Sequence, residues 1–146
     1  MKVSTRGRYG VRFMLDVAMH GDRGPVALHD VARRQGLSEK YLWQVLAPLK
    51  AVGLVRSVRG AGGGYVLARP ARKISVRDIV VTLEGESLLV DATKSPEWER
   101  SEAYVTREMW KEFEAKLAEM MAAVTLQDLV EKQKAREQVS VPTYSI

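Results

Sequence analysis

The 146-residue chain has the size of one compact domain with an appended element, and its composition, 46% hydrophobic and 28% charged, is ordinary for a globular protein. It contains no cysteine, which excludes disulfides, thiolate zinc sites, cysteine-ligated iron–sulfur clusters and a cysteine nucleophile. No apolar run approaches the roughly 18–20 residues that span a bilayer, and the first residues lack the apolar stretch of a signal peptide. We therefore expect a cytoplasmic protein without a membrane partner.

Charge is unevenly distributed along the chain. Residues 1–82 contain 15 Lys and Arg against 5 Asp and Glu, whereas residues 83–146 contain 8 against 13. A basic first half joined to an acidic second half indicates that the first half binds a polyanion. Chance clustering on a solvated surface would give the same totals, so the motifs have to decide between the two interpretations.

Apolar spacing and turn residues predict the order of the elements. Apolar residues recur at helical spacing near the start of the chain, for example Val11, Met14 and Leu15. Ser75 with Asp78 three positions later is typical of a capping box at the start of a helix. The predicted elements are helices over 8–20, 28–35, 38–52 and 75–85, strands over 54–58 and 65–68, a polar loop over 86–103, a long amphipathic helix over 105–124, a short helix from 125 and a loose tail from about 134.

Three helices followed by a two-stranded hairpin is the order of a winged helix-turn-helix domain. Gly36 and the N-capping Ser38 make a tight connection that leaves the third helix free to enter a DNA groove. Lys40, Tyr41 and Gln44 on that helix, together with Ser38, are side chains that reach phosphates or base edges. For the helices alone, a plain three-helix bundle with a solvated face remains the alternative.

The tip of the predicted hairpin strengthens the DNA-binding interpretation. Residues 59–64 include four glycines, which lose extra entropy on ordering and are suited to a backbone that approaches DNA closely. Arg59 at the base of this tip is then placed to enter a minor groove. A phosphate-binding nucleotide loop is the rival interpretation, but this segment lacks both the Gly-Lys-Ser/Thr ending and a following helix.

Four segments together resemble the Rrf2 family of bacterial transcription regulators, over residues 1–130. They are STRGRYG at 4–10, LSEKYL at 37–42, GLV at 53–55 and SVRGAGGGY at 57–65. The resemblance implies a mainly α fold with a small β-wing, in which the helix at 105–124 packs across the partner of a homodimer. It also implies a winged helix-turn-helix DNA-binding domain over 1–84, a loop over 85–104, dimerisation helices over 105–133 and a flexible tail over 134–146.

The resemblance and the helix faces assign two sets of residues. The predicted contacts to double-stranded DNA are Lys2, Ser4, Arg6, Arg8, Ser38, Lys40, Tyr41, Gln44, Ser57, Arg59 and Gly60. The predicted dimer interface comprises Met109, Phe113, Leu117, Met120 and Val124.

The chain departs from the family pattern at two places. Members that carry an iron–sulfur cluster have cysteines between the wing domain and the long helix, and by that register Trp98 and Tyr104 occupy ligand positions here. Neither side chain replaces a thiolate, so we expect no cofactor and treat this region as a candidate effector site. Relatives usually place glutamate where Trp43 stands on the recognition helix, which leaves the operator sequence open.

Without cluster ligands, the chain resembles the members of the family that regulate cysteine metabolism. The resemblance implies that Ile146, with Tyr144 and Ser145, docks into the active site of cysteine synthase through a free carboxylate and an apolar anchor. An accidental ending is the alternative interpretation.

The function expected from these observations is a sequence-specific DNA-binding transcription regulator, most simply a repressor. The alternatives are a protein that acts mainly by docking its terminal isoleucine on a metabolic enzyme, and a regulator that senses a small molecule near Trp98. The two histidines, His20 and His29, lie on different predicted helices, so we expect no metal site. No nucleophile–base pair stands out, so no catalytic residue is assigned and we do not expect an enzyme.

Overall fold

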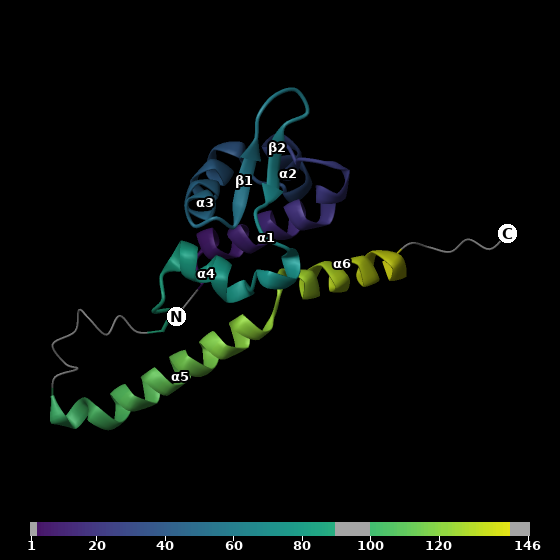
Figure 1. Ribbon diagram of the computed structural model, residues 1–146. Coiled ribbons are helices and arrows are strands. Elements are labelled where there is room, and N and C mark those ends of the chain that lie inside the picture. Colours follow the sequence, from purple (N-terminus) through teal and green to yellow (C-terminus); the bar gives the residue numbers. More distant parts are fainter. Residues whose placement is uncertain (1–2, 90–99, 141–146) are drawn as a thin grey trace.

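The computed structural model describes residues 3–89 and 100–140, which form a mainly helical fold with one two-stranded antiparallel sheet (Figure 1). The elements are α1 (Thr5–His20), η1 (Gly21–Arg23), α2 (Leu28–Gln35), α3 (Glu39–Ala51), β1 (Val55–Val58), β2 (Gly64–Leu67), η2 (Ala71–Lys73), α4 (Val76–Glu84), η4 (Ser101–Ala103), α5 (Tyr104–Ala123) and α6 (Leu126–Ser140). The predicted fold class and element order are confirmed. Five residues with a predicted role lie outside the described segments: Lys2, Trp98, Tyr144, Ser145 and Ile146.

Helix α1 lies at the centre of the domain, in contact with α2, α3, α4, α6 and β2. Its fully buried Phe13 and Met14 pack into a single apolar core with the inward faces of these neighbours. Burial of side chains of this size stabilises the fold by about 1.5–3 kcal/mol each. The other fully or nearly fully buried core residues are Val17, Val31, Leu42, Val45, Leu46, Leu49, Leu54, Val55, Ile74, Ile79 and Leu126.

Helices α2 and α3 form the helix-turn-helix unit. Gly36 ends α2, and the Ser38 hydroxyl accepts a hydrogen bond from the Tyr41 backbone N–H at 3.1 Å, as expected of an N-cap. Helix α3 continues past Pro48 as one element, because Leu42, Val45, Leu46 and Leu49 bury its inner face completely. This apolar stripe offsets the hydrogen bond that proline removes.

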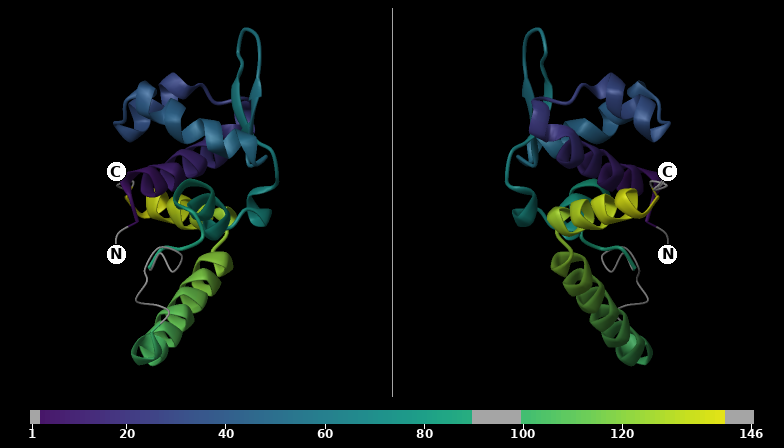
Figure 2. Two further views of the ribbon diagram at one scale, coloured as in Figure 1. Left: turned by 90° about the vertical axis from the view of Figure 1, so that its left-hand side faces the viewer. Right: turned by 90° about the vertical axis from the view of Figure 1, so that its right-hand side faces the viewer.

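The wing is the β1–β2 hairpin, which stands beside α3 at the end of the molecule opposite to α5 (Figures 1 and 2). Its register pairs Val55 with Leu67 and Val58 with Gly64. Tyr65 also forms a backbone bridge to Val26, with N–O distances of 2.8 and 2.9 Å. This bridge anchors β2, next to the turn of the hairpin, to the connection between α1 and α2.

The tip glycines are explained by the hairpin itself. Gly60 and Gly62 have positive φ angles of 103° and 76°, which side chains disfavour. A Cβ at Gly63 would lie 2.2 Å from the Val58 carbonyl oxygen, and one at Gly64 would lie 2.4 Å from the Val26 carbonyl oxygen. The geometry of the hairpin therefore accounts for these glycines without any close approach to DNA. The interpretation of the wing as a DNA contact rests on its shape and its charge.

Helices α4 and α6 close the domain on the side away from the wing. Ser75 and Asp78 form the predicted capping box at the start of α4, with hydrogen bonds of 2.9 and 3.0 Å. Helix α6 inserts the fully buried Leu126 into the core, and the Leu126 N–H donates to the Ile74 carbonyl at 2.7 Å. Ser75 and Thr125 also form an isolated antiparallel bridge, which joins the connection between α5 and α6 to the start of α4.

Two boundaries differ from the prediction by more than one residue. Helix α1 begins at Thr5 rather than at residue 8. The prediction placed the start too late because Gly7 and Gly10 interrupt the apolar pattern at the beginning of the helix. Helix α6 continues to Ser140, so the prediction of a loose tail was wrong for residues 134–140. This stretch has no apolar periodicity, and polar pairs one turn apart support it instead, such as Gln133 with Glu137 at 3.2 Å.

Candidate nucleic-acid interface

Helix α3 presents a polar face opposite its buried face. Lys40 and Gln44 are exposed and lie one helical turn apart, so both can reach into the same groove. Ser38 is exposed too, and its hydroxyl keeps its proton available to a phosphate while its oxygen caps the helix. The Glu39 carboxylate at this end of the helix lies 3.6 Å from Nδ1 of His29.

Tyr41 lies one helical turn before Gln44, at the border between the polar face and the buried face of α3. It is half-buried, and its ring meets Tyr9 of α1 edge-on, with centroids 5.5 Å apart. The guanidinium groups of Arg8 and Arg12 lie 5.9 and 5.2 Å from the Tyr9 ring centroid. No local pattern in the sequence predicts this tyrosine pair, which joins the recognition helix to the basic first turns of α1.

The first turn of α1 carries the predicted contacts Ser4, Arg6 and Arg8, all exposed. Ser4 is not free, because its hydroxyl and its backbone N–H both donate to the carboxylate of Glu84 at the end of α4. The same carboxylate oxygen accepts from the Gly7 N–H at 3.1 Å. Glu84 was missed by sequence reasoning, since nothing in the sequence links positions so far apart.

The wing carries Ser57, Arg59 and Gly60, and all three are exposed. Within residues 3–89 and 100–140, no ion pair joins Arg6, Arg8, Lys40 or Arg59 to a carboxylate. Cations that are not neutralised by their own protein are available to the phosphates of a duplex. Among the residues that the structure describes, basic side chains without an ion-pair partner thus lie on α3, on the wing and at the start of α1.

A buried ion-pair network fixes α2 against α1 and so positions the helix-turn-helix unit. The Asp16 carboxylate is almost fully buried and accepts from Arg34 at 2.7–3.2 Å and from Gln35 at 3.0 Å. Gln35 in turn accepts from Arg12 at 3.0 Å. Burial raises the pKa of the Asp16 carboxyl, but the hydrogen bonds from Arg34 and Gln35 and the positive charge of Arg34 outweigh it, so this pKa lies below its usual value.

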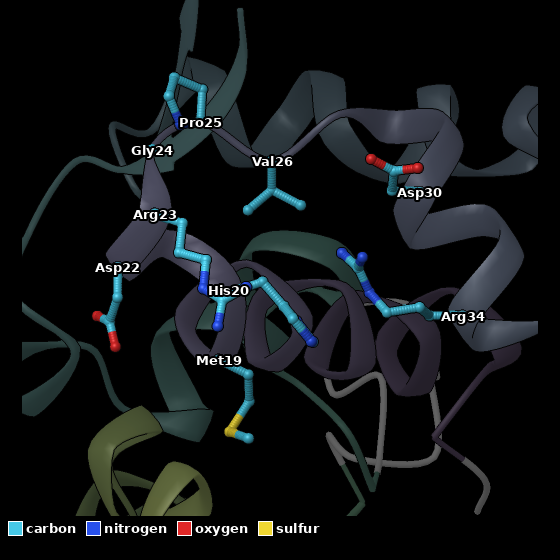
Figure 3. A pocket seen from close by; sticks show the side chains of 9 residues that line it. All are labelled: Met19, His20, Asp22, Arg23, Gly24, Pro25, Val26, Asp30 and Arg34. Atoms are coloured by element: carbon cyan, nitrogen blue, oxygen red, sulfur yellow. The ribbon is translucent and has the colours of Figure 1, made fainter. Parts of the chain in front are cut away.

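Figure 3 shows the groove beside this network, between the end of α1 and α2, with a volume of about 560 Å³. Two charged residues on its rim, Arg34 and Asp30, are already engaged in ion pairs. Arg34 extends from α2 toward α1, where it pairs with Asp16, and Asp30 pairs with Arg33 at 3.4 Å. His20 Nδ1 lies 2.9 Å from the Asp16 carbonyl oxygen. The groove is the outer edge of the network, and we assign it no ligand.

Helix α5 carries the predicted dimer residues on a surface that its own domain does not cover. None of the 20 residues of Tyr104–Ala123 is buried. Met109, Phe113 and Met120 are 37%, 47% and 68% exposed, and Leu117 is half-buried. Trp110 adds to this surface, with its ring edge-on to Phe113 at 5.8 Å. Val124 stands apart, half-buried just beyond α5, where its carbonyl accepts from the Val76 N–H at 2.8 Å.

Comparison with known proteins identifies the family. The model of the Rrf2 family, described as an iron-dependent transcriptional regulator, matches residues 3–132. The chain belongs to the Rrf2 family. The HTH-type transcriptional regulator IscR of Erwinia tasmaniensis is 42% identical over 137 residues, covering 92% of this chain and 81% of the relative. The regulatory and DNA-binding function of Rrf2 proteins agrees with the winged domain described above.

Two solved structures of Rrf2 proteins superpose on most of the chain. The structure of IscR from T. potens has a TM-score of 0.75 at 44% identity and covers 98% of this chain and 93% of its own. The structure of CymR, described as the global cysteine regulator of B. subtilis, has a TM-score of 0.75 at 36% identity and covers 90% and 98%. The similarity therefore extends through the helices that follow the wing domain.

The residues present do not fit the cysteine-ligated cluster found in some Rrf2 proteins. The chain has no cysteine, and within the two described segments no three His, Asp or Glu side chains gather as a metal site requires. Tyr104 is 55% exposed, and the Arg107 guanidinium lies 5.2 Å from its ring centroid.

Among the helices that the structure describes, none has the length and apolarity needed to cross a membrane.

Proposed function

We propose that the chain is a homodimeric repressor that binds a specific duplex sequence through α3, the wing and the first turn of α1. The observation that carries this proposal is the combination of a cation-rich winged domain with an uncovered apolar surface on α5. Recognition helices of this type enter the major groove, where Lys40 and Gln44 match guanine and adenine edges. A wing with the exposed Arg59 suits the neighbouring minor groove.

The apolar surface of α5 supports dimerisation. Large apolar side chains recur along α5 at helical spacing, and all except the half-buried Leu117 are exposed: Met109, Trp110, Phe113, Leu117 and Met120. A stripe of this kind on a helix is normally buried against another element. A second copy of α5 supplies a matching stripe, because an interface with twofold symmetry uses the same surface on both subunits.

Selection of bound DNA tests the proposal directly. Genomic fragments retained by the purified protein are sequenced, and affinity for the enriched sequence is then measured by fluorescence anisotropy over a range of salt concentrations. We expect two half-sites related by twofold symmetry and a steep fall of affinity with salt. Gln44→Ala should relax the sequence preference, whereas the matched control Gln138→Ala on α6 should leave it unchanged. Failure to enrich any sequence would refute the proposal.

Repression is tested by transcription in vitro from a promoter that contains the enriched sequence. Addition of the protein should lower the amount of transcript in proportion to occupancy of the site. Activation would refute the repressor assignment while leaving DNA binding intact. Because no residue can supply a thiolate, iron and sulfide should be absent from the purified protein, and treatment with iron and sulfide should not change its affinity for DNA.

Control of cysteine metabolism is a narrower candidate function. It is favoured by the similarity to the B. subtilis global cysteine regulator over 90% of the chain. In this proposal Tyr144 and Ile146, which lie outside the described residues, dock on cysteine synthase. Calorimetry should then detect a complex with the full-length chain that is lost on removal of Ile146, with operator affinity unchanged. Equal binding by both proteins, or by neither, would direct the search for an effector to Tyr104 and Trp98.

A further inference from the structure

The recognition helix carries an exposed indole. Trp43 is 55% exposed, although its neighbour Leu42 is fully buried. Helix geometry places it between the buried stripe and the polar face of Lys40 and Gln44, since successive residues are rotated by about 100°. The indole therefore lies at the edge of the face that enters the groove.

Contacts with the wing hold this indole in place. The Trp43 ring meets Tyr65 of β2 edge-on, with centroids 6.4 Å apart and planes at 88°. Tyr65 is 8% exposed, and its ring packs in turn against the fully buried Phe13 at 6.5 Å. The backbone of Tyr65 is fixed by its bridge to Val26. One side of the Trp43 ring thus packs against Tyr65, which in turn packs against the core. The ring is therefore held in one orientation before a ligand binds, which lowers the conformational entropy lost on binding.

A shallow groove of about 400 Å³ continues from the indole along α3. It is lined by Trp43, Leu46, Ala47, Lys50 and Ala51. Four of these side chains are apolar, and Lys50 provides a cation at the border. An apolar surface beside a cation complements the edge of a duplex, where an apolar base substituent lies within reach of the phosphate backbone.

We propose that Trp43 is a specificity-determining residue that reads a thymine through its 5-methyl group. The major groove displays hydrogen-bond donors and acceptors on every base pair, but the thymine methyl is the apolar group among them. Lys40 and Gln44 can hydrogen-bond to the donors and acceptors of the base edges. The indole, held in place by Tyr65, can contact the methyl group together with Ala47. The inference rests on the proposed function, because it requires α3 to lie in the major groove.

Replacement of thymine by deoxyuridine tests the proposal, since it removes the methyl and retains base pairing. Each thymine of the sequence selected by the wild-type protein is replaced in turn, and dissociation constants are measured for wild type and for Trp43→Ala. At one thymine per half-site we expect the wild type to lose about fourfold in affinity, the value for burial of one methyl-sized group. Trp43→Ala should bind the thymine and deoxyuridine versions of that site equally.

Two further variants separate the effect of the ring from that of folding. Trp43→Phe, which keeps an aromatic ring against Tyr65, should retain part of the thymine preference. Val52→Ala is the matched control, because Val52 is also exposed, at 49%, at the end of α3 but does not line the groove. It should show the full wild-type pattern, and circular dichroism should report the same helicity for all three variants.

The results distinguish this inference from the proposed function. Deoxyuridine effects of equal size in wild type and Trp43→Ala would refute the reading of thymine by Trp43. A uniform loss of affinity for all sequences in Trp43→Ala would also refute it, because the indole would then contact the sugar–phosphate backbone. If the wild type selects no sequence at all, the proposed function itself fails, and this inference fails with it.

Discussion

Glu84, the last residue of α4, accepts a hydrogen bond from the Ser4 N–H at 2.8 Å, and the Ser4 hydroxyl donates to the same oxygen. A carboxylate at the start of a helix also interacts favourably with the helix dipole. The last turn of α4 is therefore fastened to the first turn of α1, where Arg6 and Arg8 are placed to meet phosphates. A carboxylate beside a predicted phosphate contact repels DNA weakly. We therefore infer that the role of Glu84 is to order the backbone in the first turn of α1.

Replacement of Glu84 should loosen the first turn of α1. We expect Glu84→Ala to lower the free energy of unfolding by about 1 kcal/mol, as for other lost helix caps, and to weaken operator binding. Glu84→Gln keeps an acceptor oxygen and should lose less. Urea unfolding and anisotropy titration measure the two effects. An unchanged operator affinity in Glu84→Ala would show that order in this turn does not matter for DNA binding.

A methyl group at Gly7 should have a related effect. A Cβ there would lie 2.6 Å from Glu84 Oε1, so Gly7→Ala should displace the carboxylate and destabilise the protein. In the Glu84→Ala background the same change should be neutral or stabilising, because alanine favours helix by up to about 1 kcal/mol over glycine. Gly21→Ala is the matched control, with no atom within 4 Å of its Cβ. Additive effects of Gly7→Ala and Glu84→Ala in unfolding experiments would contradict this account.

The buried Asp16 should make stability depend on pH at the acid end. Because its folded pKa lies below the unfolded value of 3.8, its contribution is present above about pH 4 and is lost as the pH falls through the folded pKa. Asp16→Asn should lower the free energy of unfolding by roughly 2–4 kcal/mol at pH 7, since it leaves Arg34 without its anion. It should also flatten the acid limb of the stability profile.

An exposed pair on α2 serves as the control for Asp16. Asp30 and Arg33 lie 3.4 Å apart with side chains 43% and 69% exposed, so Asp30→Asn should cost less than about 1 kcal/mol. Chemical denaturation between pH 2 and pH 8 compares the two variants. Equal losses would mean that the buried network contributes no more than a surface ion pair.

Charge on α5 should separate the dimer. Phe113→Glu combined with Leu117→Glu places two carboxylates in the apolar stripe, and the mutual repulsion and desolvation cost oppose association. We expect a folded monomer with greatly reduced operator affinity in analytical ultracentrifugation and anisotropy experiments. Val139→Glu on α6, where the side chain is 87% exposed, should leave the dimer intact. A wild-type chain that sediments as a monomer at micromolar concentration would contradict the proposed dimer.

Removal of the charge at the wing tip should weaken specific binding. Arg59→Ala is expected to cost about 1–3 kcal/mol of operator affinity and to reduce the salt slope by at most about one unit. Arg136→Ala on α6 removes the same charge far along the chain from the wing and should have little effect. If Arg59→Ala binds the operator like the wild type, the wing does not contact DNA through this residue.

The sequence was sufficient to predict the features that depend on local chemistry. The N-cap at Ser38, the capping box at Ser75 and the hairpin follow from neighbouring residues and are confirmed. Long-range contacts could not be predicted in the same way. The bonds between Glu84 and Ser4, and the ring contact between Tyr9 and Tyr41, join positions whose proximity arises only after the helices pack. The roles of the candidate DNA contacts remain predictions for the experiments above.

Two hydrogen bonds hold α5 near α4: the Val124 carbonyl, just beyond the end of α5, accepts from the Val76 N–H, and Glu114 of α5 accepts from the N–H of Leu89, five residues beyond α4, at 2.6 Å. Its 20 residues span about 30 Å, so a tilt of roughly 5° moves the far end by about 2.6 Å. In a dimer held together by α5, the crossing angle of the two long helices would set the distance between the two recognition helices. The volume of the side chains in the α5 stripe would then determine the spacing between half-sites, because it affects the crossing angle. Substitutions far from DNA would therefore change which operators the protein can bind.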